Sequence, residues 1–334
     1  MSTSLDRPQY ALPALDDAIA DASELARQEH AGRTREEYAR DWRAFCRYAH
    51  ARGEAAVPAR PEFVAIWVRD HARGLDVDPS TKPRTPGTVA RRLAAIAHYH
   101  RLFGVPRAAV PTEDARVLAV LNGYRSEWAR TRVLGPRKAD PLLWDELPRL
   151  LATLDLQQKD RRDRALVLLG FATALRGTNL ATLTVEEVRF VARGLLVTPR
   201  VTKTNRHGKD EPIPVPIHPD IQRDAVAALA AWLQNSGIAS GPIFRSFTRY
   251  GELTAHALSR RDVSRILARI CARAGVDGKI SSHSLRRGFL TSAHLAGAPR
   301  HTLKHVSKHR SEDVLSGYIE DADLLRDPAL LYLH

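Results

Sequence analysis

The sequence predicts a mainly helical protein with one small antiparallel β-sheet, arranged as two domains. The chain has 334 residues, about the length of two typical domains. Most segments repeat apolar residues at the three- and four-residue spacing of a helix, whereas short β-type runs separated by turn residues occur between 185 and 217. We therefore expect a helical domain over 14–130, a basic linker over 131–141 and an α+β domain over 142–334.

In the first domain we expect helices over 15–30, from 34 onward, over 61–73, over 88–102 and over 113–128. The second of them places four aromatic residues near one face: Tyr38, Trp42, Phe45 and Tyr48. We interpret this stripe as core packing. A loop over 76–86, rich in Pro, Asp, Ser and Thr, separates the third helix from the fourth.

The charge balance favours a polyanionic partner. Lysine and arginine number 51 against 38 aspartates and glutamates, a net charge of +13, and such an excess is typical of proteins that bind nucleic acid. The alternative is a protein that is merely basic. Cys46 and Cys271 are expected to be core residues of helices, since neither belongs to a disulfide or metal motif. The chain has neither a signal peptide nor an apolar run of about 18 residues, so we expect a cytoplasmic protein without a membrane segment.

Basic residues gather in two places before residue 142. Helix 88–102 alternates an apolar stripe with a basic face, and such a helix can bury one side and lay the other along a phosphate backbone. A solvated charged face is the alternative interpretation. The segment 131–141 loses the apolar periodicity and gains Gly, Pro and basic residues, as a linker does. The candidates for DNA contact in these two places are Arg91, Arg92, Arg101, Arg132, Arg137 and Lys138.

In the second domain we expect helices over 142–154 and 161–175, and the latter is almost entirely apolar at 165–171. Strands over 185–191, 195–201 and 213–217 would form a three-stranded antiparallel sheet, with a polar loop over 204–210 between the last two. Helices over 220–235, 255–274, 284–296, 302–306 and 312–319 are expected to follow. The apolar helix would end at Arg176 and hold that arginine on a rigid support.

Five residues of this domain suit the attack of a tyrosine on a phosphodiester. His283 and Arg286 form a His-x-x-Arg motif, His309 follows, Tyr318 comes nine positions later, and Arg176 lies upstream. A phenol is a weak nucleophile near neutral pH because its pKa is about 10. Two arginines can hold the phosphate oxygens and a histidine can move protons. The set therefore predicts phosphoryl transfer through a tyrosine.

This arrangement resembles that of the tyrosine recombinases, the integrase family. The resemblance covers 140–319 and, more weakly, 14–128, which looks like the helical, SAM-like core-binding domain of the family. An arginine after an apolar helix, a lysine in a β-hairpin, His-x-x-Arg, a histidine and a tyrosine come in the family's order, although each motif alone is weak. The resemblance implies a two-domain clamp on duplex DNA, a 3′-phosphotyrosyl intermediate and a Holliday junction. It implies no metal, no ATP and no other cofactor.

The resemblance also implies roles for the arginines and histidines. Arg176 and Arg286 would clamp the scissile phosphate and offset its developing charge. His283 would handle a proton near the tyrosine, and His309 would donate a hydrogen bond to the phosphate. Arg287 would contact the DNA backbone or serve a structural purpose.

The proton donor and the nucleophile are assigned in the same way. Lys203, in the predicted hairpin, would protonate the departing 5′ oxygen, with Lys209 as the competitor in the same loop. Tyr318 would form the covalent bond to DNA. Tyr250 and Tyr332 lack the spacing from a histidine.

The sequence departs from the family's pattern at three positions. Asn179 stands where an acid usually supports the site, and an amide can orient neighbours but supplies no charge. Lys308 stands where glycine commonly precedes the histidine, and Glu320 stands where a second histidine often follows the tyrosine. The histidine run over 301–309 has no carboxylate or cysteine that would complete a zinc site, so no metal is expected.

The expected partner is double-stranded DNA with an inverted-repeat recombination site. Because each tyrosine cuts one strand, we expect a homotetramer on two DNA sites. The leucine-rich tail over 321–334 would dock on a neighbouring subunit or cap its own domain. An accessory DNA-binding protein is compatible with this assembly.

Two other functions fit the same residues. A type IB topoisomerase uses phosphotyrosine chemistry but relaxes supercoils without a partner site. A DNA-binding relative that had lost catalysis would form no covalent adduct. Among recombinases, integration, excision, resolution and inversion of a mobile element or replicon all stay open.

Overall fold

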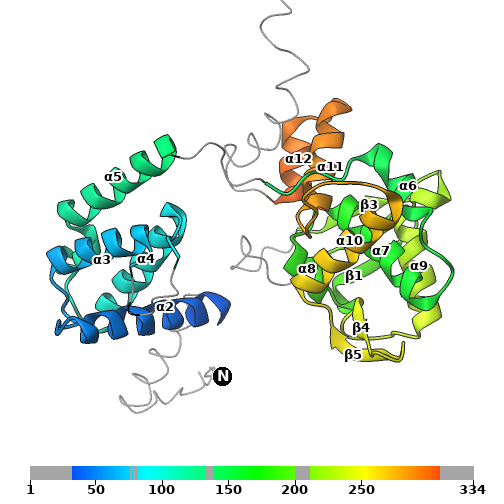
Figure 1. The fold of residues 1–334 in the computed structure, drawn as a ribbon. Coiled ribbons are helices and arrows are strands. Elements are labelled where there is room, and N and C mark those ends of the chain that lie inside the picture. Colours follow the sequence, from blue (N-terminus) through cyan, green and yellow to red (C-terminus); the bar gives the residue numbers. More distant parts are fainter. Residues whose placement is uncertain (1–31, 76, 78–81, 132–137, 200–210, 309–334) are drawn as a thin grey trace, which may run out of the picture. The chain divides into compact units, whose positions relative to one another are not determined.

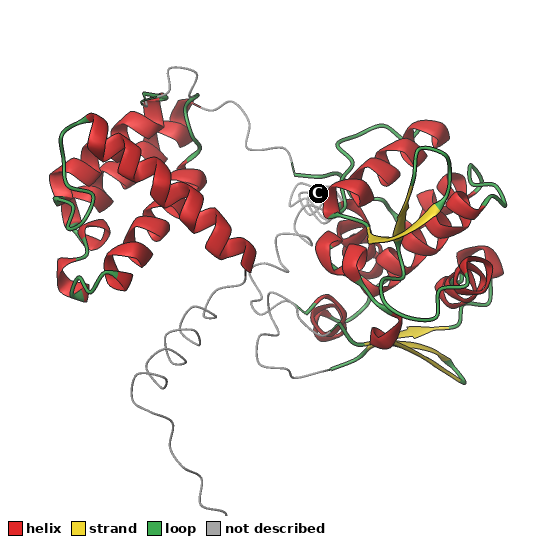
Figure 2. Ribbon diagram, turned by 90° about the horizontal axis from the view of Figure 1, so that it is seen from below, coloured by secondary structure: helices red, strands yellow, loops and turns green. Residues whose placement is uncertain are grey.

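The computed structural model describes residues 32–75, 77, 82–131, 138–199 and 211–308. Its contacts divide the chain into two compact units, 1–135 and 136–334, and each is considered by itself (Figure 1). Helices dominate both units, with small antiparallel sheets in the second (Figure 2). The predicted helices over 15–30 and 312–319 lie outside the described residues.

The first unit is built from helices that pack in pairs. They are α2 (Gly32–Ala51), α3 (Pro61–Arg73), α4 (Pro86–Leu102) and α5 (Ala115–Thr131), with two short 3-10 turns, η1 (Arg107–Ala109) and η2 (Pro111–Glu113). Helix α2 packs on α4 and α3 packs on α5. The prediction that the aromatic stripe forms core is confirmed for Trp42, Phe45 and Tyr48, which are buried. Trp42 also stacks on Tyr99 at 5.0 Å between ring centroids.

The second unit surrounds one buried helix. Its helices are α6 (Leu147–Leu151), α7 (Gln158–Thr173), α8 (Gly177–Thr182), α9 (Ala225–Ser236), α10 (Arg260–Ala274), α11 (Ser284–Leu295) and α12 (Arg300–Ser307). Short 3-10 turns are η3 (Trp144–Glu146), η4 (Val185–Glu187) and η5 (Ile221–Arg223). Helix α7 is buried along most of its length, as its apolar sequence predicts, and α9 and α11 pack against it.

The predicted three-stranded antiparallel sheet is confirmed. Strand β2 (Gly194–Val197) lies between β1 (Val188–Val191) and β3 (Ile213–Pro216). Val197 pairs with Val188 on one side and with Ile213 on the other. The first strand begins later than predicted because Thr184 and Glu187 form a capping box that holds η4.

The predicted helix over 255–274 is wrong in its first part. Strand β5 (Leu253–Ala257) pairs with β4 (Arg245–Phe247) in a second small sheet. Helix α10 begins only at Arg260, because Ser259 caps it and forms a capping box with Asp262. The sequence signal of that cap, Ser-x-x-Asp, therefore marks a helix start that the apolar spacing alone does not reveal.

Three other predicted helices are too long. The one over 220–235 begins only at Ala225, because Asp224 caps α9 after η5. The segment 142–154 contains only η3 and the short α6. Helix α7 ends at Thr173 rather than at 175, because Ala174 adopts the left-handed conformation with a φ of 48°. Arg176 therefore follows the turn after α7 instead of lying on that helix.

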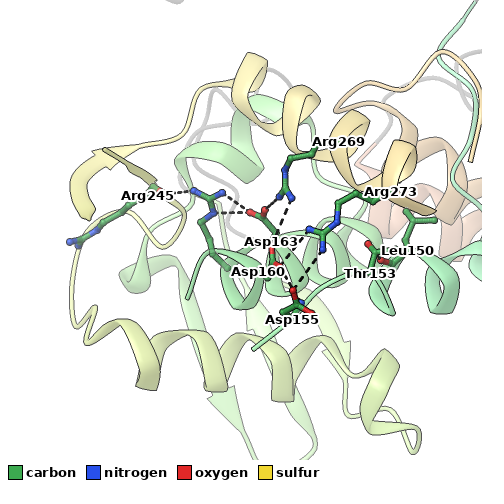
Figure 3. A network of polar contacts seen from close by, with 9 residues as sticks. Leu150, Thr153, Asp155, Asp160, Asp163, Arg245, Arg269 and Arg273 are labelled. Carbon is green, nitrogen blue, oxygen red and sulfur yellow. Dashed lines mark hydrogen bonds and ion pairs between the residues drawn. The ribbon is translucent and has the colours of Figure 1, made fainter. Parts of the chain in front are cut away.

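A buried ionic network fixes α7 to α10 (Figure 3). The carboxylate of Asp163 on α7 accepts hydrogen bonds from Nε and Nη2 of Arg162 at 2.8 and 2.6 Å, and it also pairs with Arg269 of α10. Arg273 of α10 lies 3.6 Å from the carboxylate of Asp160. Arg162 also donates to the carbonyl of Arg245 in β4 at 2.8 Å. The network therefore holds α7, α10 and β4 together.

We expect the Asp163→Ala variant to lose about 3–5 kcal/mol of folding free energy, because it leaves the buried Arg162 without its counter-charge. Asp155→Ala is the matched control. Its carboxylate is 71% exposed and lies 3.9 Å from Arg273, so we expect a loss of no more than about 1 kcal/mol. Denaturant unfolding measures both, and equal losses in the two variants would contradict the role given to Asp163.

Candidate active site

Arg176 is positioned by the turn between α7 and α8. It is the N-cap residue of α8 and has an extended backbone, directly after the left-handed Ala174 and the buried Leu175. Gly177, which follows it, allows a close approach, because a Cβ there would overlap the side chain of Ser282. Arg176 is thus brought next to the segment that carries His283.

Arg286 connects three chain segments. It lies on α11, is 2% exposed, and donates from Nη1 to the carbonyl of Ala174 and from Nη2 to the carbonyl of Ser307, both at 2.6 Å. Ala174 is two residues before Arg176, and Ser307 is the last residue of α12. The guanidinium therefore connects the turn that bears Arg176 with the segment that leads to residue 309.

His283 lies just before α11 among positive charges. Burial, followed by the positive charges of Arg286, Arg287, Arg176 and Arg260 in that order of influence, lowers the pKa of His283 to about 4. The imidazole is therefore neutral at pH 7 in the absence of DNA. A neutral imidazole can accept a proton, which is the role that the sequence predicts for this histidine.

The depressed pKa predicts how stability depends on pH. The pKa of a histidine in an unfolded chain is about 6.5. Between about pH 4 and pH 6.5, His283 is therefore protonated in the unfolded chain but neutral in the folded protein. Stability should fall as the pH is lowered through this window, and His283→Gln should lose less stability than wild type between pH 7 and pH 5. His305→Gln, at an exposed histidine of α12, is the control. If all three proteins lose the same stability, His283 is not neutral in the fold.

Four of the arginines and histidines predicted from the sequence are thus brought together: Arg176, His283, Arg286 and Arg287. Arg260 joins them and was missed, because the sequence pattern placed it inside a longer helix. The Ser259 cap was the signal that could have revealed its position. Asn179 is partly buried on α8. Lys203, Lys209, His309 and Tyr318 lie outside the described residues.

The predicted DNA contacts of the first unit are engaged in ion pairs. Arg91 pairs with Asp41, and the Nε of Arg92 lies 3.6 Å from the same buried carboxylate. Arg101 lies 3.7 Å from Glu113, with both side chains about half exposed. In the second unit, Lys138 is exposed and Arg287 is buried. Arg132 and Arg137 lie outside the described residues. Contact of any of these residues with DNA stays a prediction.

Within the described residues, no group of three histidine, cysteine, aspartate or glutamate side chains could hold a metal ion. None of their helices is long and apolar enough to cross a membrane.

The chain is similar in sequence to known recombinases and integrases. The sequence model of the phage integrase family matches residues 142–324. An integrase/recombinase XerD homolog of Selenomonas ruminantium is 33% identical over 303 residues, covering 90% of this chain and 85% of that protein. A tyrosine recombinase XerC of Syntrophus aciditrophicus is 26% identical over 157 residues, covering 47% of this chain and 48% of its own length.

The fold is also found in solved structures. The Tn1549 transposon integrase in complex with transposon right end DNA aligns with a TM-score of 0.58 at 12% identity, covering 94% of this chain and 97% of that chain. A lambda integrase dimer bound to a core site aligns with a TM-score of 0.54 at 16% identity, covering 92% and 95%. These likenesses confirm the predicted fold class.

The chain therefore belongs to the phage integrase family. It is a tyrosine recombinase, an enzyme of site-specific DNA cleavage and rejoining.

Proposed function

We propose that Arg176, His283 and Arg286 form the centre at which the scissile phosphate of duplex DNA is bound and attacked by Tyr318. The observation that carries the proposal is the pair of hydrogen bonds from Arg286 to Ala174 and Ser307, which joins the turn before Arg176 to the end of α12. Forked guanidinium groups bind two phosphate oxygens at once and keep their charge at any physiological pH.

The proposed chemistry is a reversible transesterification. The Tyr318 oxygen attacks phosphorus and passes its proton to neutral His283, while Lys203, or Lys209 in its place, protonates the departing 5′ oxygen. His309 donates a hydrogen bond to a phosphate oxygen. Attack by a 5′ hydroxyl on the phosphotyrosyl bond reseals the DNA, so neither ATP nor a metal is required.

The proposed assembly follows from this chemistry. Four protomers would bind two inverted-repeat sites, each with the domains 14–130 and 142–334 on the duplex and the linker 131–141 between them. The tail over 321–334 would dock on the neighbouring subunit, and an accessory DNA-binding protein would be optional. The reaction is proposed to take place in the cytoplasm.

Within the first domain, we propose that Arg91 and Arg92 act mainly by holding α4 to α2 through Asp41. Their shared partner is 2% exposed, and a buried carboxylate needs such counter-charges. Contacts to the DNA backbone would then fall to the more exposed Arg101 and to Arg132, Arg137 and Lys138.

A recombination assay tests the function. Purified protein is incubated with two supercoiled plasmids that carry DNA from the gene's own genomic neighbourhood, and products are mapped by sequencing. We expect recombinant junctions at one short site that contains an inverted repeat. Relaxation of any plasmid without junctions would favour a type IB topoisomerase, and binding without cleavage would favour an inactive relative.

A further inference from the structure

Arg260 lies beside the proposed active site, and the activity described so far does not use it. It is the first residue of α10 and is exposed. Its side chain makes no hydrogen bond or ion pair within the described part of the chain. An arginine has five N–H donors, and those of Arg260 have no partner among the described residues, so they are available to a ligand.

The side chain of Arg260 lies close to Gly177, the residue after Arg176. A Cβ on Gly177 would lie 3.2 Å from the Cγ of Arg260 and would overlap the side chain of Ser282. Gly177 directly follows Arg176, and Ser282 directly precedes His283. Arg260 and the segment that carries His283 therefore both lie close to the start of α8.

Ser264 on α10 connects Arg260 to the segment of His283 by hydrogen bonds. The hydroxyl of Ser264 accepts a hydrogen bond from the backbone N–H of Ser282 at 2.9 Å and donates to the carbonyl of Arg260 at 3.1 Å. One side chain thus joins the backbone of Arg260 to the residue before His283. The position of Arg260 is set by packing and hydrogen bonds rather than left to a surface loop.

The charges that act on His283 are all positive. The charged groups that act on His283 are four arginines, of which Arg260 is one. The nearby carboxylate of Asp262 accepts from Ser259 at 2.6 Å and lies 3.3 Å from Arg265, so it has partners of its own. Asn179, three residues after Arg176, is uncharged. A cluster of several arginines can bind more than one anionic group.

We propose that Arg260 binds a second phosphate, the one next to the scissile phosphate on the cleaved strand. This inference rests on the proposed function, in which Arg176 and Arg286 bind the scissile phosphate itself. Because Arg260 is exposed at the rim of the cluster while Arg286 is buried, the two guanidinium groups suit neighbouring phosphates. Arg260 would set the register of the strand before cleavage.

The first test measures the salt dependence of binding to a short duplex of arbitrary sequence, since phosphate contacts dominate such binding. For Arg260→Ala, the slope of log affinity against log salt should be smaller by about 1 than for wild type. Arg260→Lys should keep the slope because it keeps the charge. Arg261→Ala, which removes the adjacent exposed arginine, is the matched control and should leave the slope unchanged. An unchanged slope in Arg260→Ala would overturn the proposal.

The second test locates the phosphate. A nicked duplex that wild type cleaves is made with a neutral methylphosphonate at single positions beside the scissile phosphate. At one position the wild-type rate of adduct formation should fall roughly tenfold, and Arg260→Ala should show no further loss there. Equal penalties in both proteins at every position would contradict the assignment. If wild type forms no adduct, the proposed function fails, but the salt dependence still decides whether Arg260 binds phosphate.

Discussion

Replacing Gly288 by alanine is expected to remove most of the activity and a large part of the stability. Gly288 lies in α11, two residues after Arg286, and a Cβ there would overlap the carbonyl oxygen of Leu142 and lie 2.5 Å from its carbonyl carbon. The backbone at Leu142 is also hydrogen-bonded to the start of α11, because the N–H of Leu142 donates to the carbonyl of Ser284 at 3.1 Å. The clash can be relieved only by moving either α11, which carries Arg286 and adjoins His283, or the segment at residue 142.

We expect Gly288→Ala to lose about 3 kcal/mol, at the upper end of what overpacking usually costs. Gly123→Ala is the control, because Gly123 is exposed in α5 and a Cβ there would meet nothing within 4 Å. That change should stabilise the protein by about 0.5–1 kcal/mol, since alanine is the better helix former. Denaturant unfolding and adduct formation check both variants. A Gly288→Ala protein as stable and active as Gly123→Ala would refute the close contact between α11 and residue 142.

Replacing Arg286 by lysine is expected to reduce the rate of covalent adduct formation by about 10²–10³. Lysine keeps the positive charge but cannot donate to two carbonyls and a phosphate from one planar group. The carbonyls of Ala174 and Ser307 would lose their present donors, which costs about 1–3 kcal/mol for each buried acceptor left unsatisfied. The turn before Arg176 and the end of α12 should then separate.

Arg265→Lys is the matched control for this change. Arg265 lies on α10, is 65% exposed, and pairs with Asp262 at 3.3 Å, so the same substitution should change adduct formation less than about twofold. Single-turnover cleavage of a nicked duplex under saturating protein separates the chemical step from DNA binding. Wild-type cleavage by Arg286→Lys would exclude the fork geometry as part of catalysis.

The sequence was most informative where local patterns determine structure. The apolar run at 165–171 predicted a buried helix, and the aromatic spacing from Trp42 to Tyr48 predicted a core face. The motif residues Arg176, His283 and Arg286 were predicted from their order along the chain, and the structure brings them into one cluster.

Tertiary contacts explain what the sequence could not predict. Ala174 takes a left-handed conformation that usually favours glycine. The sequence therefore predicts the end of α7 two residues too late. The segment before Ser259 pairs with β4 across a turn, and that pairing overrides its local preference. The bonds of Arg286 to Ala174 and Ser307 join residues 112 and 21 positions away in the chain. No local pattern encodes them.

Asn179 on α8 is uncharged. Burial and the surrounding arginines leave the imidazole of His283 neutral. The compensating negative charge would then come from the DNA itself, through the scissile phosphate and, as proposed, its neighbour at Arg260.

The central claim is that Tyr318 attacks the DNA. Wild type, Tyr318→Phe, Tyr250→Phe and Tyr332→Phe are each incubated with a duplex from the gene's genomic neighbourhood that carries a nick near the cleavage site, so that loss of the short fragment traps the covalent product. Denaturing electrophoresis and peptide mass spectrometry then detect and locate the adduct. We predict an adduct at Tyr318 in wild type and in the other two variants, and none in Tyr318→Phe. An adduct that persists in Tyr318→Phe would contradict the account.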